Sequence, residues 1–270
     1  MCFDHDARPP DLPLPMAGGA ADGRALHLEA ADGNRFPAYA AVPTSGPRQD
    51  ALAIPAGTGI VVIPDIRGLV PYYEELALRF AEAGVLAVAV DLYARTAGTD
   101  ERGAGFDAGQ HAGRTTQEGI AADVAAAVRF LRSDAMDARG GLFTVGFCFG
   151  GRASLLQGIE DHGLAGVIGF YGFPTGSSRN GSQAPADVAD RYRCPVLALF
   201  GGDDDGIPAA AIETFDRALQ RAGIAHESVT YPGAPHSFFD RHQEPFAEAS
   251  ADAWRRMLAF MAHHAATRSA

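Results

Sequence analysis

The chain has 270 residues, 47% of them hydrophobic, which is enough to bury the core of one large α/β domain. Its formal net charge of −11 argues against nucleic-acid or anionic-membrane binding, because both need clustered lysine and arginine. Three cysteines make no disulfide framework, the proline-rich N-terminus has no signal-peptide apolar run, and no stretch approaches membrane-spanning length. We therefore expect a soluble, cytoplasmic protein with reduced thiols.

The first part of the chain is predicted to be an arm over residues 1–24, followed by a single domain over 25–270. Two short runs, 25–30 and 35–42, flank the sequence ADGN. An Asp-Gly between two such runs indicates a β-hairpin. Residues 43–57 are rich in Pro, Gly, Ser and Ala and are expected to form a loop.

From there strands and helices alternate, which predicts a mostly parallel sheet with helices on both faces, an α/β architecture. Short apolar runs predict buried strands at 59–64, 85–90, 141–147, 166–172, 194–200 and 227–233. Helical periodicity predicts helices at 72–84, 115–133, 148–159, 207–223 and 245–265. Residues 94–113 and 173–188 are expected to be loops. Thr115 and Glu118 form a capping pair at the start of one helix, with Thr116 as the other cap candidate.

The stretch TVGFCFGG at residues 144–151 has the shape of G-x-S-x-G, the strand-to-helix turn that carries a serine nucleophile in α/β-hydrolases. Cys148 stands where the serine belongs. The start of a helix favours a thiolate through its unpaired N–H groups and its dipole. Cys148 is therefore a candidate nucleophile, although a cysteine in a glycine-rich turn can also be a small packed residue.

Other strand ends supply the remaining catalytic types, because sites in such sheets lie at the carboxyl ends of strands. GGDDDGIP (201–208) offers three adjacent aspartates that spacing alone does not separate, and His236 follows the last strand. The order nucleophile, acid, base is that of α/β-hydrolase triads. The N–H groups of Phe149 and Ile66 are candidate oxyanion-hole donors. Taken singly, the histidine could be a solvated loop residue and the aspartates an acidic turn.

The chain resembles the dienelactone hydrolases, the carboxymethylenebutenolidase group of α/β-hydrolases. The matching stretches are PDIRG (64–68), VDLYAR (90–95), GFCFGG (146–151), GFYG (169–172), GGDDDGIP (201–208) and YPGAPHSFF (231–239). The resemblance implies an α/β-hydrolase fold with Cys148 as nucleophile, His236 as base and, four residues before Pro208, Asp204 as triad acid. It also implies that an acidic residue, here Asp65, accepts the thiol proton. The alternative for Asp65 is an ion pair with Arg67 or Arg95.

Substrate-binding residues are less well defined in the sequence. The family binds a substrate carboxylate with two arginines, one of them four residues past the catalytic histidine, where this chain has Asp240. Arg95 and Tyr171 are the candidates here, and the loop after DLYAR also contains Arg102 and Arg114. Six aromatic residues are candidates for an apolar site or for core packing, namely Phe147, Phe149, Phe170, Tyr171, Phe238 and Phe239.

These observations predict a hydrolase that cleaves a small ester or enol lactone through a cysteine acyl-enzyme, acting as a monomer or homodimer. A thiolate favours activated esters, lactones and thioesters over amides. The alternatives are a general carboxylesterase or thioesterase and, from another class, a non-catalytic binding or redox-sensing protein. No cofactor is expected. Metal binding by Cys2, Asp4, His5 and Asp6 is disfavoured because these ligands lack a spaced partner.

Overall fold

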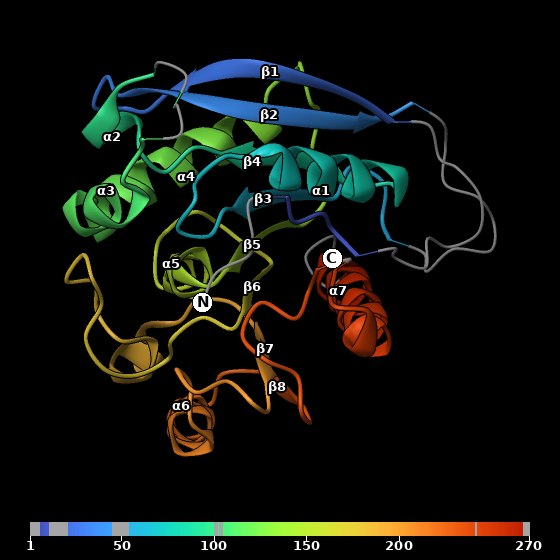
Figure 1. Ribbon diagram of the computed structural model, residues 1–270. Helices are drawn as coiled ribbons and strands as arrows, with labels where there is room; N and C mark the ends of the chain where they lie inside the picture. The colour runs from blue at the N-terminus through green and yellow to red at the C-terminus, as the bar shows by residue number, and fades with distance from the viewer. Residues whose placement is uncertain are drawn as a thin grey trace.

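The computed structural model describes residues 6–10, 21–44, 54–99, 102, 105–240 and 242–266. An eight-stranded sheet forms its centre, in the order β1-β2-β4-β3-β5-β6-β7-β8 (Figure 1). The strands are β1 (Ala21–Glu29), β2 (Arg35–Pro43), β3 (Gly59–Ile63), β4 (Leu86–Val90), β5 (Leu142–Phe147), β6 (Gly166–Phe170), β7 (Val196–Gly201) and β8 (His226–Tyr231). Strands β3 to β8 run parallel, while β2 pairs antiparallel with both β1 and β4.

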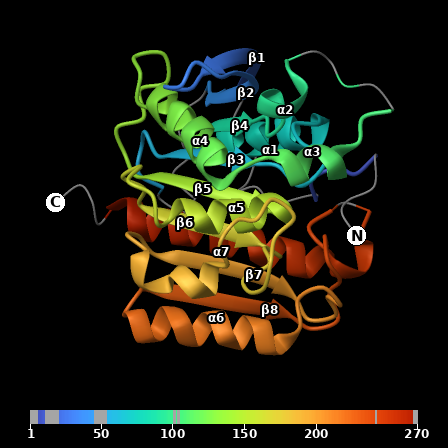
Figure 2. The same ribbon diagram turned by 90° about the vertical axis from the view of Figure 1, so that its left-hand side faces the viewer.

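Helices cover both faces of this sheet. They are α1 (Pro71–Glu82), α2 (Ala94–Ala97), α3 (Ala108–Arg114), α4 (Gln117–Leu131), α5 (Phe149–Gln157), α6 (Ala209–Ala222) and α7 (Ala247–Ala266), with 3₁₀ turns η1 (Pro185–Arg191) and η2 (Glu244–Phe246). Helices α1 and α7 pack on one face, and α4, α5 and α6 on the other (Figures 1 and 2). The predicted mostly parallel sheet between two helical layers is therefore confirmed.

The local sequence explains both strand and helix at the start of this sheet. All five residues of β3 are buried, as expected for an unbroken apolar run between two helical layers. Helix α1 begins with Pro71, whose missing N–H costs nothing in the first turn. It buries one face, including Tyr73, Leu76 and Phe80, against the sheet. The chain then leaves the helix through Gly84, which has a φ of 88°.

The hairpin at the start of the domain was predicted from the Asp-Gly signal and is observed. Strands β1 and β2 pair from Ala21 with Pro43 to Glu29 with Arg35. Strand β1 begins at Ala21 and so includes the last residues of the predicted arm. Residues 1–5 and 11–20 of that arm, and 45–53 of the predicted loop, lie outside the described residues.

Three local predictions were wrong in detail. The segment 94–113, expected to be a loop, contains α2 and most of α3, and Asp107 caps α3 by accepting the Gln110 N–H at 2.9 Å. Thr116 caps α4 by accepting the Gly119 N–H at 3.0 Å, whereas the Thr115 hydroxyl donates to the Ala112 carbonyl. The segment 173–188 runs into η1, where Pro185 opens a 3₁₀ turn.

Candidate active site

Cys148 lies at a sharp turn between β5 and α5, two elements at the centre of the molecule. Its φ of 54° and ψ of −114° place a non-glycine residue in a strained conformation. The turn closes tightly, since a Cβ on Gly146 would lie 1.9 Å from the Gly150 carbonyl oxygen and one on Gly150 would lie 2.0 Å from the Pro64 carbonyl oxygen. Only glycine fits at both positions, and the turn thereby presents the thiol at the strand end.

His236 and Asp204 come together from two other strand ends. The Nδ1 atom of His236 lies 2.6 Å from Oδ2 of Asp204, and the other carboxylate oxygen accepts the Gly206 N–H at 2.9 Å. Both residues are largely buried, with side chains 10% and 2% exposed. Asp203 and Asp205 are exposed, and neither bonds to His236 within the described part of the chain, so the geometry separates the three aspartates that spacing left open.

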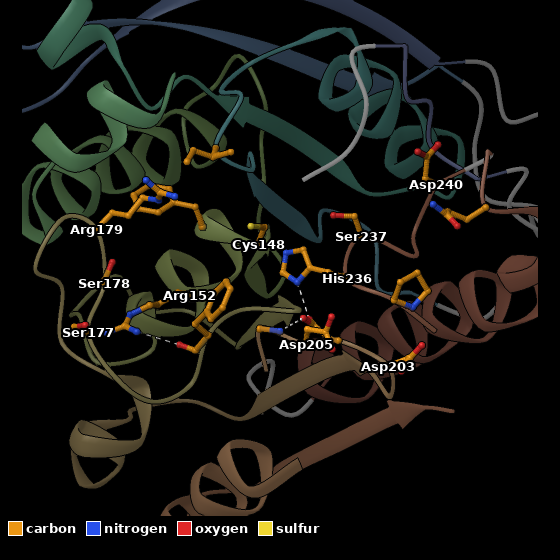
Figure 3. Close-up of a pocket in the computed structure, with 17 residues that line it drawn as sticks. Cys148, Arg152, Ser177, Ser178, Arg179, Asp203, Asp205, His236, Ser237 and Asp240 are labelled. Carbon is orange, nitrogen blue, oxygen red and sulfur yellow. Dashed lines mark hydrogen bonds and ion pairs between the residues drawn. The ribbon is translucent and has the colours of Figure 1, made fainter. Parts of the chain in front are cut away.

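A cavity of about 730 Å³ joins these groups. Cys148, Asp204 and His236 all line it, together with Ile66 and Phe149. The main-chain N–H groups of Ile66 and Phe149 donate to no acceptor within the described part of the chain. Figure 3 shows the thiol of Cys148 and the imidazole of His236 facing this cavity. The structure therefore brings together the predicted nucleophile, base, acid and both predicted oxyanion donors.

Asp65 lies directly before Ile66 but does not line the cavity. It is completely buried and binds Arg67, whose Nε lies 3.0 Å from Oδ2 and whose N–H donates to Oδ1 at 2.9 Å. Burial raises the pKa of Asp65 despite the nearby guanidinium. The carboxyl therefore faces Arg67, which is the ion-pair alternative for this residue.

Arg95 and Tyr171, the two candidate substrate-binding residues, are not among those that line the cavity. Arg95 binds Asp32 at 2.6 Å and Asp123 at 2.8 Å, which ties the β1–β2 turn to α4. Tyr171 is fully buried, and its ring centroid lies 4.9 Å from that of His236. Burial raises the pKa of Tyr171 well above its ordinary value, so its phenol stays neutral.

The remaining arginines of that region are also placed away from the cavity. Arg102 binds the buried carboxylate of Asp91, with Nη2 lying 2.7 Å from Oδ2. Arg114 is exposed on α3. Of the six aromatic candidates, Phe149 lines the cavity, whereas the other five are buried in the core: Phe147, Phe170, Tyr171, Phe238 and Phe239.

Several cavity residues were not predicted from the sequence. Arg152 reaches the cavity from α5, and Phe173, Ser177, Ser178 and Arg179 reach it from the segment after β6. Asp240 lines it as a buried carboxylate and accepts the main-chain N–H of Arg8 at 3.3 Å. The loop sequence has no periodic pattern that could predict these contacts. For Asp240 the signal was its position four residues after His236, where the family resemblance implies a substrate-binding residue.

Charges in the cavity are separated. Figure 3 places the two arginines, Arg152 and Arg179, on one side of Cys148, and the acidic residues Asp203, Asp205 and Asp240 on the other side. Arg179 is exposed and makes no ion pair within the described residues.

No group of three His, Cys, Asp or Glu side chains suited to a metal occurs among the residues described. In the same residues, none of the helices is both long and apolar enough to cross a membrane.

The fold and this arrangement of side chains define an α/β-hydrolase. The sequence matches the description "Dienelactone hydrolase family" over residues 44–265, most of its length, and the chain belongs to that family. The family name gives the class of activity, a hydrolase of lactones or esters.

Individual relatives agree with this assignment. A Salmonella typhimurium protein named "Putative carboxymethylenebutenolidase" is 31% identical over 86% of this chain and 84% of its own length. A Bradyrhizobium protein named "Probable 2-oxo-3-(5-oxofuran-2-ylidene)propanoate lactonase" is 28% identical over 79% of this chain and 88% of its own. A crystal structure titled as a "Putative Dienelactone Hydrolase" from Klebsiella pneumoniae superposes with a TM-score of 0.76 at 29% identity, covering 90% of this chain and 99% of that one.

Proposed function

We propose that this protein hydrolyses a small ester or enol lactone through a thioester on Cys148. The observation that carries the proposal is the hydrogen bond from His236 Nδ1 to buried Asp204. It fixes the tautomer and leaves Nε2 as the ring nitrogen available to a thiol that lines the same cavity. The names of the relatives support a lactone, an ester closed into a ring, as the substrate.

The reaction follows from these positions. His236 Nε2 takes the thiol proton, and the sulfur attacks the carbonyl carbon. The N–H groups of Ile66 and Phe149 stabilise the resulting oxyanion. When the carbon–oxygen bond breaks, the imidazolium returns its proton to the departing oxygen, which for an enol lactone remains attached to the acyl chain. Water, deprotonated by His236, then attacks the thioester, and the carboxylic acid leaves as the thiol re-forms.

The first experiment compares hydrolysis of a cis-dienelactone with that of p-nitrophenyl acetate by wild type, Cys148→Ala and Cys194→Ala. Cys194 is the matched control, because it is also buried but does not line the cavity. We expect Cys148→Ala to lose both activities and Cys194→Ala to retain them. Mass spectrometry of the quenched wild type should find the acyl group on the peptide that contains Cys148. Full activity in Cys148→Ala would contradict the proposal.

The same experiment separates the lactonase from a general carboxylesterase or thioesterase. Two observations favour the alternative: the cavity has room for a ligand larger than one lactone ring, and Asp240 stands where the family resemblance implies an arginine. Turnover of the simple ester alone, lost in Cys148→Ala, would support the esterase. A preference for the lactone in kcat/KM would support the lactonase.

A further inference from the structure

Arg152 is a buried cation on the helix that begins after the nucleophile. It is 3% exposed, and no carboxylate lies within ion-pair distance of it among the described residues. Burial lowers the pKa of its guanidinium. A buried guanidinium with no carboxylate in ion-pair contact is costly unless it is hydrogen-bonded. Asp187 acts on it only at longer range, and its two Nη atoms, though not Nε, have acceptors, which indicate what it does.

Those acceptors are four main-chain carbonyls of one segment, residues 173–182. The Nη1 atom donates to Phe173 and Thr175 at 3.4 and 3.3 Å, and Nη2 donates to Gly176 and Ser182 at 2.9 and 2.8 Å. The segment contains no helix or strand. Main-chain hydrogen bonds from Ala186 to Pro174 and from Gly181 to Ser178 also hold it, and among the described side chains Arg152 donates the most hydrogen bonds to it.

Phe173, the first residue of this segment, covers the catalytic pair. Its ring centroid lies 5.7 Å from that of His236, on whose ring Tyr171 also packs. The ring of Phe173 also lies over Gly206, where an added Cβ would be 3.1 Å from Cε1. The N–H of Gly206 is the one that binds Asp204. Phe173 thus contacts both the base and the turn that holds the acid.

We propose that Arg152 is a positioning residue for the hydrolytic site: it holds residues 173–182 in place and so keeps Phe173 against the imidazole of His236. This inference rests on the proposed function in that it assigns His236 the role of base. Covering an imidazole with an aromatic ring limits the water that reaches it and restricts its rotation. The arginine therefore acts on the chemistry through Phe173, without touching the substrate's reacting atoms.

The test compares Arg152→Met and Phe173→Leu with wild type, and Arg191→Met is the control. Arg191 is exposed, and among the described residues its side chain donates only to the Gln183 side chain, just beyond this segment. We expect the first two variants to lower kcat for p-nitrophenyl acetate about tenfold with little change in KM. Arg191→Met should be unchanged. The double variant should be no slower than Phe173→Leu, because both changes act through one contact.

The second readout is the pH dependence of kcat/KM and of Cys148 alkylation by iodoacetamide. The titratable groups facing the imidazole are Asp204, Cys148 and Tyr171, and Arg152 and the cavity aspartates lie beyond them. Uncovering the ring changes its contact with water, so the acid limb should shift in both variants and in the same direction. A lowered unfolding midpoint with an unmoved pH profile would mean a merely structural role and would overturn the proposal.

Alkylation requires no turnover, so this experiment remains informative if no tested ester is hydrolysed. Hydrolysis that survives Cys148→Ala would contradict the proposed function. Alkylation profiles that coincide for wild type, Arg152→Met and Phe173→Leu would contradict the present inference. If Arg152→Met does not fold, Arg152→Lys tests the contact between Arg152 and residues 173–182, and Phe173→Leu tests the contact between Phe173 and His236. Lysine keeps the charge but cannot reach four carbonyls, so we expect an intermediate shift, and a wild-type profile in both would overturn the inference.

Discussion

The cavity has two walls that are held in place by different means. At the turn around Cys148, main chain packs on main chain so closely that a Cβ at Gly150 would lie 2.0 Å from the Pro64 carbonyl oxygen. Across the cavity, residues 173–182 are held by hydrogen bonds from side chains such as Arg152, and a Cβ on Gly181 would meet nothing within 4 Å. We call the turn around Cys148 the chemical wall and residues 173–182 the substrate wall. The comparison teaches that the chemical wall has no room for an added side-chain atom, whereas the substrate wall can be altered while Cys148 stays in place.

The largest effect should come from Asp204, the proposed acid of the site. Asp204→Asn keeps the shape but lets the amide favour the wrong imidazole tautomer, so we expect kcat to fall about 10³- to 10⁴-fold. Asp205→Asn is the matched control, because it lines the same cavity but is exposed and makes no bond to His236. Steady-state kinetics on p-nitrophenyl acetate measures both. Equal losses would show that general cavity charge, and not the hydrogen bond to His236, sustains the activity.

The next effect concerns stability and tests the comparison of the walls directly. Gly150→Ala forces a methyl group onto the Pro64 carbonyl and should lower the free energy of unfolding by at least about 3 kcal/mol, or prevent folding. Gly181→Ala adds the same methyl group in open space at a φ of +68° and should cost about 1 kcal/mol. Urea unfolding monitored by circular dichroism measures both values. Similar losses in the free energy of unfolding for the two variants would show that the two walls are equally tolerant of an added methyl group.

Substitution of Asp65, which lies next to Ile66 near the turn around Cys148, separates an effect on stability from an effect on activity. Because burial raises its pKa, the folded protein binds this proton more tightly than the unfolded chain. The stability it contributes is thus present below the ordinary pKa of about 3.9 and is lost as pH rises through the folded value. At about pH 7 we expect Asp65→Asn to be at least as stable as wild type with kcat/KM within about twofold, because this carboxyl faces Arg67 and does not line the cavity.

The measurement is urea unfolding of both proteins from about pH 4 to about pH 7, beside the kinetics. The difference in stability should shrink toward the acid end, where the wild-type carboxyl is protonated and resembles the amide. A variant that is less stable at neutral pH would show that the Arg67 ion pair stabilises the fold, and a kcat/KM lowered about tenfold would show that this carboxyl takes part in the reaction.

The smallest effect should come from the substrate wall. Arg179 is exposed at the cavity, so its attraction for a substrate carboxylate is screened by water. We expect Arg179→Gln to lower kcat/KM about two- to fivefold for an ester bearing a carboxylate, a change that corresponds to the free energy of an exposed ion pair. A neutral ester of the same size should be unaffected. Arg191→Gln, which changes an exposed arginine outside the cavity lining, should affect neither substrate.

The sequence predicted those parts of the site that follow from strand ends. Parallel strands place their carboxyl ends at one edge, so Cys148, Asp204 and His236 could be expected to converge, and the choice of Asp204 followed from the family motif. The sheet and its two helical layers were predictable for a similar reason, because buried strands and amphipathic helices leave periodic patterns.

The substrate wall could not be predicted in the same way. Arg152 lies on a nearly uniformly buried helix, where a single charged residue carries no sign of the distant carbonyls that it binds. Phe173 begins a loop of polar residues whose path is set by those long-range hydrogen bonds. Arg95 shows the converse, because its place in a shared motif suggested substrate binding whereas its guanidinium joins two carboxylates, Asp32 and Asp123.

The strand order also bears on how the molecule is made. Strand β5 pairs with β3, and β6, β7 and β8 are then each added beside the strand that precedes them in the chain. A chain emerging from the ribosome can therefore build this half of the sheet outward in order of synthesis. Cys148 is completed with β5, whereas His236 follows only after β8. During synthesis the proposed nucleophile therefore exists before the proposed base, and the proposed site is complete only when the chain beyond β8 has been made.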